Sequence, residues 1–215
     1  MGTNLEISRH YPKKIELDET LVQTGPQFLR LKTATGAPQL RQVSLRLMGA
    51  GDKAKMLEFA RGLHEEDQLF LRSDITDPAT VDDWLRGIEQ GTTVTLLAEP
   101  EGRLAGYASL HVNPLRWTRK VGEISINTAR EWQSRGLGEN LCAEIVELGR
   151  TLELRKITAQ MVADHKSARA MFERLSFHIE ALLPDWVEDR ERQCRDLLLM
   201  AYDLRPKGHP RELKH

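Results

Sequence analysis

Two spacings of apolar residues alternate along the chain and predict strands and helices in turn. Apolar and polar positions alternate in one set of segments, as is typical of strands with one buried face. The expected strands span residues 14–17, 28–31, 43–47, 92–98, 104–112, 121–128, 156–162, 177–182 and 196–204. Glu99-Pro100-Glu101-Gly102 has the turn-forming residues of a hairpin between two of these strands.

A helical spacing of three to four residues marks the remaining segments. It predicts helices over residues 53–63 and 167–175, another from residue 78, and a long one from residue 137. In the long helix one stripe should be buried, formed by Leu137, Leu141, Ile145, Leu148 and Leu152. The opposite face should be solvated, with Glu139, Glu144, Glu147 and Arg150. The pattern predicts an α/β (α+β) fold in which helices flank a mixed central sheet.

The length and charge of the chain limit the number of domains and the classes of partner that we expect. With 215 residues and 24.5 kDa, one buried core is expected. We expect an N-terminal extension with short strands over residues 1–41, the main domain over 42–205 and a loose tail over 206–215. Because 31 basic residues balance 32 acidic ones, no overall field favours nucleic acid or an anionic membrane.

The sequence also predicts no segment that would span a membrane. The first twelve residues lack the apolar centre of a signal peptide, and the longest apolar run, residues 197–202, is too short to span a bilayer. We therefore expect a cytoplasmic protein with no membrane or nucleic-acid partner and no metal, and leave a homodimer open.

A glycine-bearing turn, Gln133-Ser134-Arg135-Gly136-Leu137-Gly138, lies between the strand at 121–128 and the long helix. Glycines let the backbone approach a phosphate, and the helix N-terminus contributes about half a positive charge at the same place. The turn therefore predicts a site for a phosphorylated cofactor. A tight turn without a ligand is the alternative.

The spacing of the turn excludes two other glycine motifs. A dinucleotide fingerprint needs a third glycine where Leu141 stands, and a phosphate-binding Walker loop needs Lys and Ser or Thr where Glu139 and Asn140 follow Gly138. What remains is Gln/Arg-x-x-Gly-x-Gly/Ala, in which the chain resembles the GNAT acyltransferase superfamily. The resemblance extends over about residues 43–204, with its specific part at 123–177.

The GNAT resemblance implies a single GNAT-like domain that binds acetyl-CoA as co-substrate. It implies that backbone groups of the strand before the turn pair with the pantetheine arm of the coenzyme. The residues matching the cofactor site are Ile126, Asn127, Thr128, Gln133, Ser134, Arg135, Gly136, Leu137, Gly138, His165 and Phe172. A further stretch, residues 59–72, is similar to the first helices of GNAT domains in bacterial protein-lysine acetyltransferases.

Glu123 is the candidate catalytic base. On a strand it shares a face with Ser125 and Asn127, opposite Ile124 and Ile126, so its carboxylate points to the polar side. Burial would raise its pKa and suit it to accept a proton from an amine, directly or through water. Family members often carry a glutamate near this position in that role. The alternative is a structural ion pair, for example with Lys120.

The second helix departs from the family pattern Asn-x-x-Ala-x-x-x-Tyr-x-x-x-Gly-Phe. His165 replaces the asparagine that contacts the cofactor, Ser176 replaces the glycine, and Phe172 replaces the tyrosine that many members use as general acid. Phe172 cannot donate a proton, so either the thiolate leaves unprotonated or His165 or Tyr107 assists. A thiol with a pKa near ~8.5 is a tolerable leaving group. His165 could instead be an exposed loop residue without a role.

The resemblance implies an N-acetyltransferase that transfers an acetyl group from acetyl-CoA to a primary amine of a small molecule or a protein lysine. Four residues are candidates for an acceptor pocket, although surface aromatics also cover core edges. They are Tyr107, His111, Trp117 and Trp186. The alternative, which Phe172 keeps open, is a CoA-binding sensor or partner-recruiting module with little or no catalysis.

Overall fold

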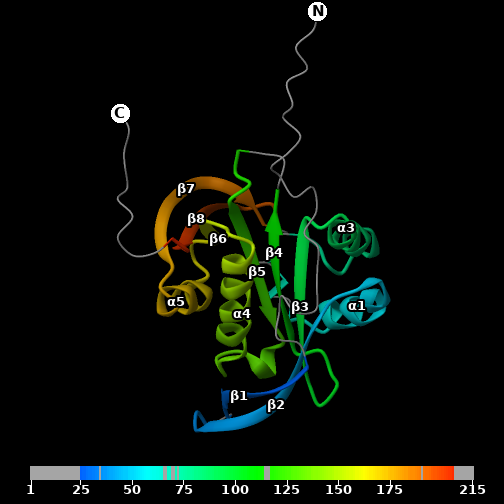
Figure 1. Cartoon of the computed structure of the whole chain (residues 1–215). Coiled ribbons are helices and arrows are strands. Elements are labelled where there is room, and N and C mark those ends of the chain that lie inside the picture. The colour runs from blue at the N-terminus through cyan, green and yellow to red at the C-terminus, as the bar shows by residue number, and fades with distance from the viewer. Residues whose placement is uncertain are drawn as a thin grey trace, which may run out of the picture.

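The computed structural model describes residues 25–33, 35–64, 67–68, 71, 73–113, 117–189 and 191–205. The predicted strand at residues 14–17 and the predicted tail at 206–215 lie outside the described residues. Eight strands of the described chain form one sheet in the order β1-β2-β3-β4-β5-β6-β8-β7 (Figure 1). The strands are β1 (Gly25–Lys32), β2 (Pro38–Leu47), β3 (Thr93–Pro100), β4 (Gly106–Val112), β5 (Val121–Thr128), β6 (Lys156–Val162), β7 (His178–Glu188) and β8 (Cys194–Asp203).

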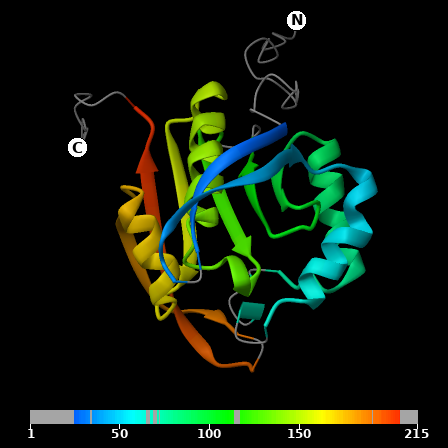
Figure 2. The ribbon, with the colours of Figure 1, turned by 90° about the horizontal axis from the view of Figure 1, so that it is seen from below.

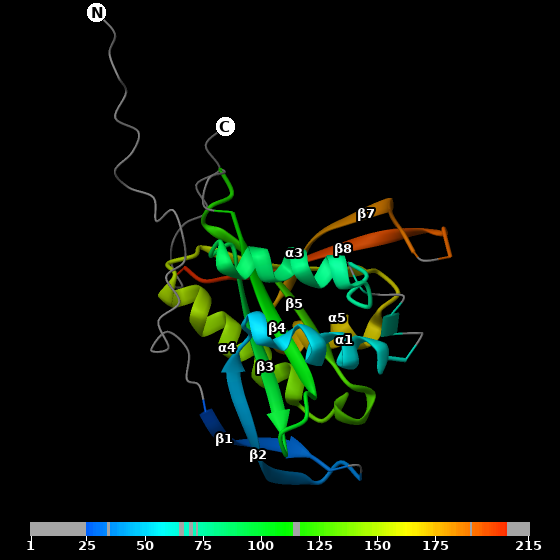
Figure 3. The same ribbon diagram turned by 90° about the vertical axis from the view of Figure 1, so that its right-hand side faces the viewer.

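Helices cover both faces of this sheet. The α-helices are α1 (Lys53–Arg61), α3 (Pro78–Glu89), α4 (Leu137–Thr151) and α5 (Lys166–Arg174), with short 3-10 turns η2 (Ala50–Asp52) and η3 (Arg130–Trp132). Helices α1 and α3 pack on one face, and α4 and α5 on the other (Figures 2 and 3). This arrangement confirms the predicted mixed α/β fold. No helix of the described chain is both long and apolar enough to cross a membrane.

Helix α4 supplies the centre of the larger core. Its predicted stripe is confirmed, because Leu137, Leu141 and Ile145 are 0% exposed and Leu148 is 1% exposed. Leu152 is only partly buried at the C-terminal end of the helix. Burying each such side chain contributes about 1.5–3 kcal/mol of transfer free energy, so this helix fixes the position of the glycine turn at its start.

The structure extends the predicted end of one strand. We expected a strand over residues 177–182, whereas β7 runs from His178 to Glu188. Pro184 and Asp185 interrupt the alternation there, Asp185 has a φ of 51°, and the register with β8 shifts between Leu183 and Val187. A bulge of this kind breaks the two-residue period from which a strand is recognised.

Candidate active site

The central feature of the site is the separation of β5 from β6. These two strands are parallel, and they pair only over Val121–Ile124 and Lys156–Ala159, although both strands are described in full. On its other side β5 stays paired with β4 as far as Thr128. The edge of β5 after Ile124 is therefore open on the β6 side, where an extended ligand can hydrogen-bond to the backbone.

The glycine turn follows β5 and the short 3-10 turn η3, and it leads into α4. Gly136 precedes the helix with a φ of 95°, and Ser134 also has a positive φ, 57°. Glycine adopts this left-handed conformation without a steric cost. Asn140 holds the turn, because its backbone N and its side-chain Nδ2 both donate to the Gly136 carbonyl, at 3.1 and 2.7 Å.

A cavity of about 140 Å³ adjoins this turn. Its wall includes Gln133, Ser134 and Gly138 from the turn, and Met171 and Arg174 from α5. A Cβ at Gly138 would lie 3.0 Å from Met171 Sδ, so glycine lets α4 and α5 approach here. A backbone that is free of side chains at a helix N-terminus suits a diphosphate, and these residues fit the predicted coenzyme.

A second cavity, of about 870 Å³, lies toward α3. Both cavities are lined by Ile126 and Asn127 of β5 and by His165 and Ala168 beside α5. The open end of β5 therefore lines both the pocket at the glycine turn and the larger pocket.

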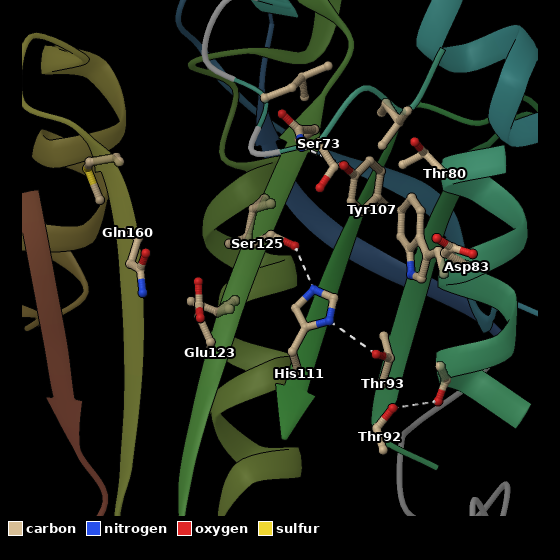
Figure 4. A pocket seen from close by; sticks show the side chains of 18 of the residues that line it. Ser73, Thr80, Asp83, Thr92, Thr93, Tyr107, His111, Glu123, Ser125 and Gln160 are labelled. Carbon is tan, nitrogen blue, oxygen red and sulfur yellow. Dashed lines mark hydrogen bonds between the residues drawn. The ribbon is translucent and has the colours of Figure 1, made fainter. Parts of the chain in front are cut away.

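Hydroxyl groups and a histidine line the sheet side of the larger cavity (Figure 4). His111 Nδ1 lies 3.1 Å from Thr93 Oγ1, and His111 Nε2 lies 3.3 Å from Ser125 Oγ, so the imidazole bridges β3 and β5. Asn127 Nδ2 donates to the Tyr107 hydroxyl at 2.6 Å. Burial raises the pKa of Tyr107 above its ordinary value, so this phenol is a weak proton donor.

Glu123 lies in the same cavity, on the same strand face as Ser125 and Asn127. It is directly opposite His111 in the β4–β5 register, and Figure 4 shows it with Gln160 on one side and His111 on the other. Lys120, the structural partner suggested from the sequence, has its Nζ 3.4 Å from Glu153 Oε2.

His165 lines both pockets, and Phe172 lines the larger one. Phe172 is 6% exposed and packs edge-on against Phe177, with ring centroids 4.9 Å apart. His165 precedes α5, and burial lowers its pKa below the ordinary value despite the opposing charge of Asp67. At neutral pH its imidazole is therefore neutral, with one N–H donor and one acceptor.

The aromatic candidates for the acceptor pocket divide into two pairs. Tyr107 and His111 line the larger cavity. Trp117 and Trp186 are 89% and 64% exposed, and neither is among the described residues that line a cavity.

Sequence reasoning did not select the α3 wall of the larger cavity. It contains Thr80, Trp84 and the paired Asp83 and Arg86. The sequence signal at this wall was the helical spacing of the apolar residues that include Trp84. That spacing indicated only that the helix packs against the sheet. Trp84 Nε1 donates to Thr95 Oγ1 at 2.9 Å, which holds α3 against the sheet.

The described residues contain no group of three or more His, Cys, Asp or Glu side chains that could hold a metal ion. The site as described is built from backbone groups, hydroxyls, carboxylates and imidazoles.

An open strand edge, a glycine turn before a helix and an adjoining polar pocket define an acyl-CoA transferase type of site. The model of the acetyltransferase (GNAT) family matches residues 57–177, which is more than half of the chain. The chain belongs to the GNAT family. No curated protein matches it.

Solved structures show the same fold at low identity. A GNAT-family acetyltransferase from Streptococcus pneumoniae is 20% identical, with a TM-score of 0.66 over 75% of this chain and 99% of that one. A ribosomal-protein-alanine N-acetyltransferase from Brucella melitensis is 22% identical, with a TM-score of 0.65 over 74% and 98%. The putative acetyltransferase yncA from Salmonella typhimurium, solved with its cofactor acetyl-CoA, is 20% identical, with a TM-score of 0.65 over 78% and 97%.

Proposed function

We propose that this protein transfers an acetyl group from acetyl-CoA to a primary amine of a small molecule or a protein lysine. The observation that carries the proposal is the meeting of two cavities at the open end of β5, where both are lined by Ile126, Asn127 and His165. A two-substrate transfer needs such a junction, because the acyl donor and the acceptor must be held within reacting distance.

The coenzyme side is formed by the residues that the family resemblance identified. The backbone of Ile126, Asn127 and Thr128 offers hydrogen bonds to an extended amide-containing arm at the open edge of β5. The turn from Gln133 to Gly138 offers N–H groups to a diphosphate. His165 lies at the junction of the two cavities, and Phe172 lines the larger cavity from α5. When bound, the coenzyme supplies the activated acetyl thioester.

Glu123 acts as the base in this proposal. An amine is protonated near neutral pH and attacks a thioester only after losing a proton. The Glu123 carboxylate accepts that proton directly or through one water. Direct attack of the neutral amine then needs no covalent acyl-enzyme and no metal.

The leaving thiolate needs no strong acid. Phe172 has no hydroxyl, Tyr107 is a weak donor because burial raises its pKa, and His165 is neutral because burial lowers its pKa. A thiol with a pKa near ~8.5 leaves without a donor, so transfer is slowed but not prevented.

The test measures thiol release from acetyl-CoA with a panel of amines and peptides, together with CoA binding by calorimetry. CoA at a hundred times its dissociation constant should stabilise the fold by about 2.7 kcal/mol. Gly136→Asp should weaken CoA binding, because a side chain is strained at this φ of 95° and its Cβ would face the Arg30 carbonyl oxygen 3.7 Å away, so the turn has to shift. Gly102→Asp is the matched control, since Gly102 also has a positive φ, 77°, and lines neither cavity. Unchanged CoA affinity in Gly136→Asp would refute the assignment.

The second candidate is a CoA-binding sensor or partner-recruiting module. The observation that favours it is the packing of Phe172 on Phe177 at the position of the family's acid. Tight CoA binding without thiol release from any amine in the panel would support this candidate over the enzyme.

A further inference from the structure

The hairpin formed by β1 and β2 lies outside the family match at residues 57–177, yet it contacts the glycine turn. Lys32 N donates to the carbonyl oxygen of Arg135 at 2.8 Å. A Cβ at Gly136 would lie 3.7 Å from the Arg30 carbonyl oxygen and 3.9 Å from Leu31 Cδ2. The free edge of β1 therefore runs beside the turn, below the start of α4 (Figure 1).

This contact fixes the direction of the N–H groups in the turn. In a planar trans peptide the C=O and the following N–H point in opposite directions. Because the Arg135 carbonyl points to Lys32, the Gly136 N–H points away from β1. Asn140 holds the Gly136 carbonyl in the same way. The Leu137 N–H therefore points in the opposite direction, out of the N-terminal end of the helix. Two successive peptide units are thus oriented by partners within the protein.

A second contact links the hairpin to the same loop through Trp132. The guanidinium carbon of Arg41, in β2, lies 5.6 Å from the centroid of the Trp132 ring, and that of Arg135 lies 5.9 Å from it. Trp132 packs against the main core and lines the cavity at the turn. Cation–π contacts of this kind are attractive, so they help to hold the loop against the hairpin.

The hairpin itself is firmly attached to the domain. Leu29 and Leu31 of β1 are buried in the same core as Leu137 of α4, at 8% and 1% exposure. The outward residues Phe28 and Leu40 are exposed. A rigid core anchor on one side and a hydrogen bond to the turn on the other allow β1 to hold the turn in place.

We propose that the β1–β2 hairpin is part of the coenzyme site, with the Lys32 N–H as a positioning group that holds the glycine turn in its anion-binding conformation. The inference rests on the proposed function, since it requires CoA to bind at this turn. A turn that is ordered before binding avoids the entropic cost of ordering on binding. Loss of the contact therefore weakens the affinity for CoA and leaves the acceptor pocket unchanged.

The decisive variant is Lys32→Pro, which removes the N–H. Lys32 is the last residue of an edge strand, and its N–H points to Arg135 rather than into the β1–β2 pairing. Proline is tolerated at such a place. The loss of one hydrogen bond, worth about 0.5–1.5 kcal/mol, should raise the dissociation constant of CoA about twofold to tenfold. The measurement is calorimetric titration of the full chain with CoA.

Two matched variants separate the backbone group from other effects. Lys32→Ala removes the charge and keeps the N–H, so it should bind CoA within about twofold of the wild type. Phe28→Pro places a proline on the same strand edge four residues earlier, where the N–H faces the same side, and should also bind normally. In steady-state kinetics Lys32→Pro should raise KM for acetyl-CoA and leave KM for the amine unchanged.

The outcomes distinguish this inference from the proposed function. If the wild type does not bind CoA, the coenzyme site is refuted and the role of the hairpin with it. If the wild type binds and folded Lys32→Pro binds equally well, the role of the hairpin alone is refuted. Equal weakening in Lys32→Ala and Lys32→Pro would also refute it, because the side-chain charge would then be the cause.

Hydrogen exchange on the wild type provides a test that does not depend on the folding of a variant. CoA binding should slow amide exchange in a peptide that covers residues 25–33, relative to one that covers residues 178–189. Equal changes in the two peptides would contradict the inference.

Discussion

The two faces of the sheet differ in the polarity of the side chains that they carry. The face under α4 and α5 is a continuous apolar core in which Leu141, Ile145 and Ile157 are 0% exposed. The face toward α1 and α3 contains hydroxyls, the Glu123 carboxylate and an ionic cluster beside a smaller core. The difference indicates that the first face mainly provides stability and holds the glycine turn, while in the proposed function the second face provides the chemistry.

The largest expected effect comes from a cavity in the apolar face. Leu141→Ala should destabilise the protein by about 2–5 kcal/mol, because it removes a fully buried side chain from α4. Urea unfolding followed by circular dichroism measures this change. Leu182→Ala is the control, since Leu182 is 53% exposed, and a similar loss in both variants would contradict the contrast.

A substitution of Glu123, on the polar face, should change activity rather than stability. Glu123→Gln should lower kcat at neutral pH about 100-fold or more, because the amide cannot accept the proton of the amine. The affinity for CoA should remain unchanged. Glu153→Gln, whose side chain is 86% exposed, is the control for the loss of a carboxylate. A fully active Glu123→Gln enzyme would remove Glu123 from the mechanism.

The ionic cluster makes the stability of the polar face depend on pH. Arg46 donates to both Asp52 and Glu99, at 2.6–2.9 Å, and Lys55 Nζ lies 2.6 Å from Glu99. Hydrogen bonds from Arg46 lower the pKa of both carboxyls below their ordinary values of 3.8 and 4.5. Their contribution is therefore complete above about pH 4.5 and is lost as the pH falls through the lowered values.

Arg46→Met should accordingly destabilise the protein by about 2 kcal/mol at pH 7, and the difference from the wild type should shrink below pH 4. Urea unfolding at a series of pH values measures it. The control is Arg169→Met, which breaks a surface pair with Glu173 worth about 0.3–0.5 kcal/mol. A difference that persists unchanged at acid pH would contradict the assignment.

The smallest effect is expected at the link between α3 and the sheet. Trp84→Phe removes the hydrogen bond to Thr95 and should cost about 1 kcal/mol. Since Trp84 also lines the larger cavity, KM for the amine should rise while KM for acetyl-CoA stays constant. Trp117→Phe, at a residue that is 89% exposed, should change neither.

The sequence predicted the apolar face better than the polar one. The stripe from Leu137 to Leu148 was recognisable because one helix carries it at a fixed spacing. Three residues that line the larger cavity, Trp84, Thr93 and Gln160, come from the separate elements α3, β3 and β6, and no local period connects such residues. Likewise, the contact between Lys32 and Arg135 joins residues far apart in the chain through backbone atoms, which the residue types do not reveal.

The open edge of β5 has a consequence for how this protein can change over evolution. A ligand arm that pairs with main-chain amides places few demands on the side chains that those amides carry. Selection then acts on the path of the strand rather than on its residues. Proteins that share only about a fifth of their residues, such as this chain and the 20% identical Streptococcus pneumoniae protein, can therefore keep the same fold.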